Sequence, residues 1–150
     1  MKLSKFTDYA LRTALYLAAH EDRLVSISEI SAAHGIPQSS VMKVVNQLVD
    51  GGFLSSTRGR LGGVRLSRPA SEQRVGDIAR YMEGDTPMVD CSSCLLRGSC
   101  GLVRGLYEAQ NAYYDSLNRF TVAEAVRADP RTMGILLGAA AKKGESGLEA

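Results

Sequence analysis

The chain is poor in the residues from which most catalytic and membrane sites are built. It has no tryptophan and only two histidines, and neither His20 nor His34 lies beside a paired carboxylate or a nucleophile motif. No catalytic constellation is visible, so we expect no enzymatic activity. No apolar run approaches the roughly 20 residues that a membrane-spanning helix needs, so we expect no membrane partner.

Cysteine is scarce as well, but all three cysteines lie within ten residues. Cys91, Cys94 and Cys100 form a C-x2-C-x5-C pattern, with Gly98 and Gly101 in the same segment. An odd number of cysteines fits disulfide chemistry badly, because one thiol is left free. Unpaired cysteines, and an N-terminus that passes directly into an amphipathic pattern, predict a protein of the reducing cytoplasm.

Three interpretations of the cysteine cluster follow from its spacing. Thiolates together with one non-cysteine ligand can hold an iron–sulfur cluster, which satisfies the count of three. Zinc is a competitor, although the second C-x-x-C or Cys/His pair of most zinc sites is missing. A redox-active or merely buried set of thiols is the third. The spacing favours the iron–sulfur interpretation and leaves the other two open.

Charge is unevenly distributed along the chain. Residues 1–75 carry 10 Lys and Arg against 6 Asp and Glu, a net charge of +4, whereas residues 76–150 carry 8 against 10, a net charge of −2. The stretch 55–70 contains four arginines and no acidic residue. A basic, glycine-rich segment of this kind favours contact with phosphate groups.

The first half of the chain has the pattern of a helix-turn-helix followed by a hairpin. Periodicity predicts its elements in this order: helices over 4–20, 27–34 and 37–50, then strands over 53–57 and 64–67. Gly35 separates the second and third helices, and Ser26 and Glu29 have the form of a capping box. Together these elements predict a winged-helix DNA-binding domain over residues 1–70.

The partner expected for this domain is double-stranded DNA. The residues expected to contact it are Gln38, Ser39, Ser40 and Lys43 on the third helix, and Arg58, Arg60 and Arg65 on the hairpin. The third helix would read the major groove. On the hairpin, or wing, Arg60 lies at the tip and is placed for the minor groove, whereas Arg58 and Arg65 are placed for phosphates.

The second half of the chain, over residues 71–137, is expected to hold the cysteine loop and a long dimerisation helix. Its predicted helices cover 75–82, 102–118 and 122–127. Along the longest of them, apolar residues recur every three to four positions at Leu102, Leu106, Ala109 and Tyr113, which predicts a seam for a second copy and hence a homodimer. Asp129 and Pro130 are expected to end the helical part, and residues 138–150 to form a flexible tail. The predicted fold class is mainly α.

Several motifs of this sequence occur together in one known family. They are KFTDYALR at 5–12, RGRLGGVRL at 58–66, VGDI at 75–78, the cysteine loop before a long helix, and FTVAE at 120–124. On these motifs the chain resembles the Rrf-two family of bacterial iron–sulfur transcription regulators, up to about residue 137. The resemblance implies a homodimeric winged-helix repressor that binds operator DNA.

Further motifs are similar to the nitric-oxide-sensing branch of this family, namely VDC at 89–91, LRGSC at 96–100 and EAQ at 108–110. That likeness implies a cluster held by Cys91, Cys94 and Cys100, with Asp8 of the other subunit as fourth ligand and nitric oxide as the signal. It favours a [4Fe–4S] cluster. Relatives usually have a longer first cysteine gap than the two serines found here, so [2Fe–2S] is the alternative.

Other functions stay open at this point. In a regulator of iron or cluster supply from the same family, the cluster would report iron status, and Asp8 would only stabilise the start of its helix. A zinc-dependent regulator and a small redox protein are more distant alternatives. The arginine-rich hairpin argues against the redox protein, because electron transfer does not need it.

Overall fold

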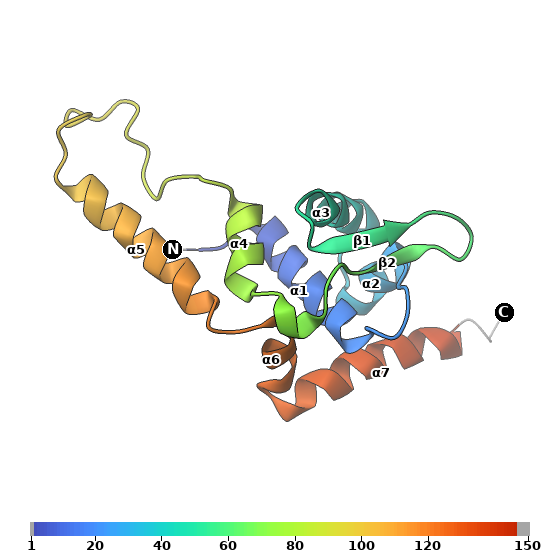
Figure 1. The fold of residues 1–150 in the computed structure, drawn as a ribbon. Helices are drawn as coiled ribbons and strands as arrows, with labels where there is room; N and C mark the ends of the chain where they lie inside the picture. Colours follow the sequence, from blue (N-terminus) through green and yellow to red (C-terminus); the bar gives the residue numbers. More distant parts are fainter. Residues whose placement is uncertain (1, 147–150) are drawn as a thin grey trace.

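A computed structural model describes the backbone of residues 2–146 and the side chains of residues 2–138; Figure 1 shows its arrangement. The elements follow in the order α1 (Lys5–Ala19), α2 (Ile27–His34), α3 (Gln38–Asp50), β1 (Leu54–Thr57), β2 (Gly63–Leu66), the 3-10 helix η1 (Ala70–Glu72), α4 (Val75–Glu83), α5 (Leu102–Leu117), α6 (Val122–Arg127) and α7 (Pro130–Ser146). The predicted class, mainly α with a winged helix-turn-helix, is confirmed.

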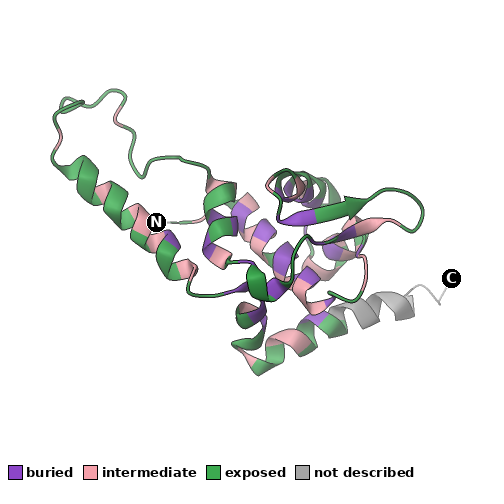
Figure 2. Ribbon diagram, in the orientation of Figure 1, coloured by how far each residue is buried: buried purple, intermediate pink, exposed green. Residues whose placement is uncertain are grey.

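The described part of the chain divides into a well-packed region and an exposed one. We call residues 2–83 and 119–138 the reading head, because α1, α2, α3 and the β1–β2 wing lie there. Residues 84–118, which comprise the cysteine loop and α5, form an arm that extends to one side of the head (Figure 1). Buried positions concentrate in the head, whereas the arm is mostly exposed (Figure 2).

The core of the reading head forms from the apolar faces of its helices. Side chains that are at most 1% exposed include Ala10, Tyr16, Leu17, Ile30, Val41, Val44, Leu48, Ile78 and Val126. The spacing of these residues on α3 places them on one face, as the helical period requires. On α1, Thr7 and Tyr16 lie in the core, while Phe6 and Tyr9 are only partly buried.

The helix-turn-helix is delimited by the expected end signals. The Ser26 hydroxyl accepts a hydrogen bond from the Glu29 amide at 3.1 Å, which satisfies one free N–H at the start of α2. Gly35 ends α2 in the left-handed conformation, at φ 62°. The second half of the predicted capping box is wrong. The Glu29 carboxylate instead accepts hydrogen bonds from the Tyr16 hydroxyl at 2.7 Å and from Arg23 at 3.0 Å, and so ties α2 to α1.

The wing is anchored to the reading head by its second strand. β1 and β2 pair antiparallel, with Leu54 opposite Leu66. Val64 on β2 also exchanges two backbone hydrogen bonds with Val25, at 3.0 and 2.8 Å. The neighbouring Gly63 lies so close that a Cβ there would come within 2.7 Å of the Val25 carbonyl oxygen. A side chain at Gly63 would therefore separate the wing from the segment that precedes α2.

The arm is joined to the head where the last turn of α5 crosses the start of α4. The Asn118 side chain accepts a hydrogen bond from the Asp77 amide and donates one to the Asp77 carboxylate, both at 2.8 Å. Beside it, a Cβ on Gly76 would lie 2.3 Å from the Tyr114 carbonyl oxygen. Only glycine permits this close crossing. The α4–α5 crossing is thus fixed by a hydrogen-bonded pair and a missing side chain.

The structure adds one helix that the sequence pattern did not predict. Pro130, expected to end the helical part, is the first residue of α7, a position where its lack of an N–H costs nothing. The Asp129 carboxylate accepts a hydrogen bond from the Arg131 amide at 2.9 Å, and the Asp129 backbone carbonyl accepts one from the Thr132 amide at 3.0 Å. Residues 138–146, predicted to lie in a flexible tail, are helical, and 147–150 lie outside the described residues. Leu136 on α7 is 8% exposed within the core.

Candidate nucleic-acid interface and cysteine loop

The start of α3 presents three of the four residues that were predicted to contact DNA from this helix. Gln38 and Ser39 are exposed, and Ser40 is half-buried. Pro37 precedes the helix and makes no side-chain cap, so the N-terminal end of α3 keeps the partial positive charge that favours phosphate groups. Lys43 is engaged within the subunit, because its ammonium group lies 4.5 Å from the centre of the Phe6 ring.

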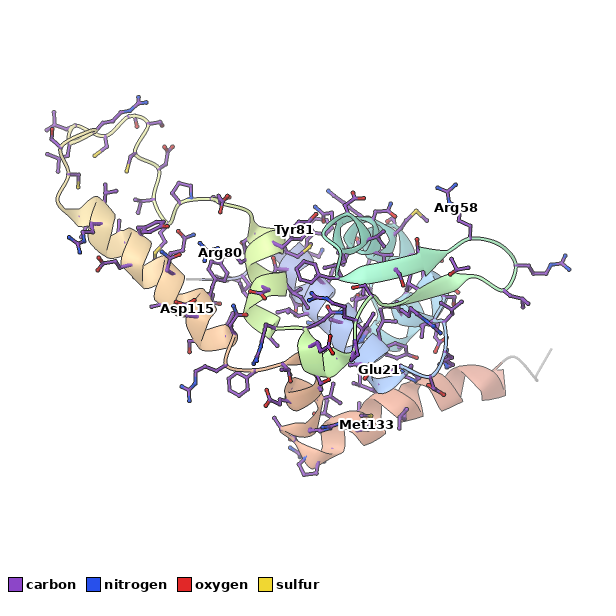
Figure 3. The ribbon with its side chains drawn as sticks, in the orientation of Figure 1. Glu21, Arg58, Arg80, Tyr81, Asp115 and Met133 are labelled. Carbon is purple, nitrogen blue, oxygen red and sulfur yellow. The ribbon has the colours of Figure 1, made fainter. Side chains whose placement is uncertain are left out.

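The wing presents the three predicted arginines to solvent. Arg58, Arg60 and Arg65 are all exposed, and Figure 3 shows Arg58 directed away from the body of the protein. Within the described part of the chain, none of the three forms an ion pair with an acidic side chain. The hairpin turn is narrow, since a Cβ on Gly62 would lie 2.1 Å from the Thr57 carbonyl oxygen. The wing therefore offers unneutralised guanidinium groups on a closely turned hairpin, as phosphate contact requires.

The cysteine loop carries its three thiols on an exposed stretch of turns. Cys91 and Cys100 are half-buried, Cys94 is exposed, and all three are free thiols. The Cys94 amide donates to the Cys91 carbonyl at 3.3 Å, and the Arg97 amide donates to the Cys94 carbonyl at 3.1 Å. Leu95 is 98% exposed, so the loop has little packing of its own.

Local hydrogen bonds, rather than packing, shape the loop. The Ser92 amide donates to the Asp90 carboxylate at 2.8 Å. Hydrogen bonding by the Ser92 side chain, together with this amide, holds the pKa of the Asp90 carboxyl below its ordinary value. The Arg97 guanidinium donates to the Ser92 carbonyl at 3.2 Å. These contacts lie at the surface and are few, so the loop can rearrange around a bound group without loss of core packing.

Asp8 lies on the first turn of α1, away from the cysteines of its own subunit. It forms an ion pair with Arg12 at 2.7 Å, with both side chains nearly half exposed. Within the part of the chain that the structure describes, no three His, Cys, Asp or Glu side chains gather closely enough to hold a metal ion. A single subunit therefore does not bring Asp8 together with Cys91, Cys94 and Cys100.

The donor set of the loop nevertheless suits an iron–sulfur cluster. Three thiols, which are soft ligands that suit iron, lie within one segment, and no packed core restrains that segment. The histidines are engaged elsewhere, because His20 stacks on Tyr16 at 4.4 Å and His34 meets the same ring at 5.7 Å. Burial also lowers the pKa of His34. The loop thus offers three thiols as ligands, and a fourth ligand of such a cluster would have to come from outside the loop.

Glu83 is a residue of interest that the sequence pattern did not reveal. It ends α4, immediately before the cysteine loop, and its carboxylate accepts hydrogen bonds from the Ser4 amide at 2.7 Å and from the Thr7 hydroxyl. Burial by itself would raise the pKa of Glu83, but the hydrogen bonds from Thr7 and Ser4 outweigh it and hold that pKa below its ordinary value. Glu83 thereby connects the base of the loop to the turn of α1 that carries Asp8.

Comparison with known proteins identifies the family. The profile of the Rrf2 family, which is the family that the sequence motifs resemble, matches residues 3–128. This is a family of iron-dependent transcriptional regulators. No helix in the described residues is long and apolar enough to cross a membrane.

Solved structures share the fold over most of their length. IscR of T. potens is 24% identical, with a TM-score of 0.68 over 85% of this chain and 88% of its own. CymR (YrzC), the global cysteine regulator of B. subtilis, is 23% identical, with a TM-score of 0.71 over 86% of this chain and 98% of its own. A transcriptional regulator of Listeria innocua is 25% identical, with a TM-score of 0.69 over 85% of this chain and 87% of its own.

Proposed function

Because this chain belongs to the Rrf2 family of transcriptional regulators, we propose that it is a homodimeric repressor whose affinity for operator DNA is controlled by an iron–sulfur cluster. Three thiols on one exposed loop, with no further cysteine in the chain, are the observation that carries the proposal. In this proposal Cys91, Cys94 and Cys100 hold the cluster, and Asp8 of the partner subunit completes it. The cluster would supply a site that small molecules can attack, and such an attack would change how the loop is ligated.

A second subunit is expected to cover α5. Along this helix only Tyr114 is buried, and Leu102, Val103 and Tyr107 are 63%, 51% and 62% exposed. Contiguous apolar exposure of this kind marks an interaction surface. A symmetric dimer through α5 would place two reading heads on one duplex, as two half-sites about 34 Å apart require.

A physical route from the loop to the DNA-reading helix runs through Glu83. The cysteine loop begins one residue after Glu83, whose carboxylate holds the start of α1 through Ser4 and Thr7. α1 packs against α3, so a change at the base of the loop would alter the position of the recognition helix. A coupling of about 1–3 kcal/mol between loop and DNA, or roughly 5–150-fold in affinity, suffices for a switch.

We propose nitric oxide as the signal, as in the repressor NsrR. The motifs around the cysteines resemble those of that branch, apart from the shorter first cysteine gap, and a carboxylate among thiolates is a weak ligand that a small molecule can displace. A cavity of about 130 Å³ adjoins Cys91 and is lined by Pro87, Met88 and Val89 of the loop and Val103, Leu106 and Tyr107 of α5. Its apolar lining suits a small uncharged molecule better than an ion.

The second candidate is a regulator of iron or cluster supply, like IscR or RirA. The similarity in fold to IscR of T. potens favours it. Both candidates require a cluster, but they differ in what removes or modifies it. Anaerobic protein should be brown and contain iron and sulfide; its absorption spectrum and operator affinity should change on addition of nitric oxide if the first candidate holds. Insensitivity to nitric oxide, with DNA binding that follows iron supply, would establish the second.

Asp8 provides a sharper test. Asp8→Ala should keep the fold and the cysteine-bound iron, yet shift the absorption spectrum of the cluster and change its rate of reaction with nitric oxide. Asp8→Cys should react more slowly, because a thiolate is the stronger ligand for iron. Arg12→Ala is the matched control, since it also removes the ion pair with Asp8. If both Asp8 variants match the wild type in spectrum and rate, Asp8 is only a helix-start residue.

A further inference from the structure

The first two cysteines share a single β-turn. The turn consists of Cys91, Ser92, Ser93 and Cys94, and it is closed by the 3.3 Å hydrogen bond from the Cys94 amide to the Cys91 carbonyl. The end residues of a β-turn have Cα atoms within about 7 Å, and disulfides accept Cα separations of about 4.4–6.8 Å. Cys91 and Cys94 can therefore be joined by a small movement of the backbone.

Cys100 is separated from this pair by further structure. The Arg97 amide donates to the Cys94 carbonyl at 3.1 Å, and the Ser99 amide donates to the Leu96 carbonyl at 2.9 Å, so two more turns follow Cys94. Cys100 then leads into α5, where its carbonyl accepts from the Val103 amide at 3.5 Å. A bond between Cys94 and Cys100 would have to undo these turns, whereas a bond between Cys91 and Cys94 would not.

The pair is also open to reagents. Cys94 is exposed and Cys91 is half-buried, and the neighbouring Leu95 makes almost no contact. A small disulfide can thus reach the Cys94 sulfur first, with Cys91 close enough to react next. The Arg97 guanidinium, bound to the Ser92 carbonyl at 3.2 Å, helps to keep the turn closed.

We propose that, in the metal-free protein, Cys91 and Cys94 form a reversible disulfide with a low-molecular-weight disulfide as oxidant. The Cys94 thiolate attacks one sulfur of the oxidant, and a first small thiol leaves. The Cys91 thiolate then attacks the Cys94 sulfur, the internal S–S bond forms, and the second small thiol leaves. The protein gives up two thiol hydrogens and two thiols are released, so the exchange balances. Cys100 keeps its free thiol.

This disulfide would remove two of the three thiolates of the loop. This consequence rests on the proposed cluster. Once oxidised, a metal-free subunit takes up no new cluster until a reductant cleaves the Cys91–Cys94 disulfide. In a reducing compartment such a bond is transient, which is typical of regulatory rather than structural disulfides.

The sequence allows a direct test by mass spectrometry. Tryptic cleavage places Cys91 and Cys94 together in peptide 81–97 and Cys100 alone in peptide 98–104. Metal-free protein treated anaerobically with oxidised glutathione is blocked with N-ethylmaleimide and digested. Peptide 81–97 should be unlabelled and lighter by two hydrogens, and peptide 98–104 should carry one label. A cross-link between the two peptides, or glutathione on Cys94 without an internal bond, would overturn the proposal.

Two variants and a metal probe complete the experiment. Cys100→Ser should still form the internal bond, and Cys94→Ser should not. With Co²⁺ as the probe, the oxidised wild type should lose the cobalt–thiolate absorption of the reduced protein and regain it after reduction. If reduced protein assembles no iron–sulfur cluster, the proposed function fails while the mass result stands. If the cluster assembles but the internal bond never forms, only this inference fails.

Discussion

The reading head and the arm place their apolar residues in opposite environments. In the head, Leu48 and Ile78 are fully buried, whereas in the arm Leu95 is 98% and Leu102 63% exposed. Of the described arm residues, 84–118, only Tyr114 is buried. The head therefore obtains its stability from its own core. The arm has apolar surface and thiols that its own subunit leaves uncovered, so its final structure depends on what binds it.

The largest effect is expected when the thiols of the arm are removed. Cys91→Ala, Cys94→Ala and Cys100→Ala should each lose most of the iron and sulfide, because the loop has no replacement ligand. In the metal-free form, each variant should have the same thermal unfolding midpoint as the wild type, since the loop adds nothing to the core of the head. Iron and sulfide assays and circular dichroism measure the two effects. A colourless wild type with one tightly bound zinc per subunit would refute the cluster assignment.

Truncating one leucine in each region tests the same contrast energetically. Leu48→Ala in the head should lower the free energy of unfolding by about 2–5 kcal/mol, because it leaves a cavity in the core. Leu95→Ala in the arm should change it by no more than about 0.5 kcal/mol, as is usual at exposed positions. Urea titrations give both values. Equal effects would mean that the loop is packed in solution.

DNA affinity should also separate the two regions. Arg60→Ala on the wing should weaken operator binding by about 1–3 kcal/mol. Arg104→Ala on the arm is the control, since Arg104 is exposed and, among the described residues, pairs with Glu108 one turn away on α5. A gel-shift titration that gives Arg60→Ala the wild-type affinity would show that the wing does not contact the operator.

The smallest expected effect lies at Glu83, where head and arm meet. Its pKa is lowered in the folded protein, so this carboxylate stabilises the fold above its unfolded pKa, and that contribution is lost as the pH falls through the folded pKa. Glu83→Gln should therefore be less stable than the wild type at neutral and higher pH, where the carboxylate contributes fully. It should approach the wild type in the acid range, so its loss of stability on acidification is smaller. Glu108→Gln, whose partner is the exposed Arg104, is the control. Identical acid slopes for Glu83→Gln and the wild type would contradict this account.

The head was largely predictable from sequence because its signals are local. Ser26 and Gly35 mark both ends of α2, and the observed bounds Ile27–His34 agree with the prediction. α6 likewise begins after Thr121 and ends at Arg127, as predicted. Contacts between elements were not visible in the pattern. Nothing local shows that Glu83 binds the start of α1, or that Lys43 lies over Phe6, because these pairs are distant in sequence.

Helix α7 was not predicted for a different reason. An Asp-Pro pair stops one helix, but it also suits the start of the next, with Asp129 as cap and Pro130 as first residue. Met133, Leu136 and Leu137 recur at helical spacing after it, and Met133 and Leu136 pack on the core. The cysteine site could be predicted as a set of ligands but not as a geometry, because a single subunit leaves the thiols apart from Asp8.

The α4–α5 crossing at Gly76 and Asn118 makes α5 a lever. Its fulcrum is the last turn of the helix, and the cysteine loop is attached to the far end. With 16 residues at 1.5 Å each, the lever is about 24 Å long. A rotation of about 5° at the fulcrum therefore moves the loop end by about 2 Å, from simple geometry on that helix length. Conversely, a displacement of ångström size at the cysteines becomes a rotation of only a few degrees at the head, so the crossing converts a local change of ligation into a small change of angle.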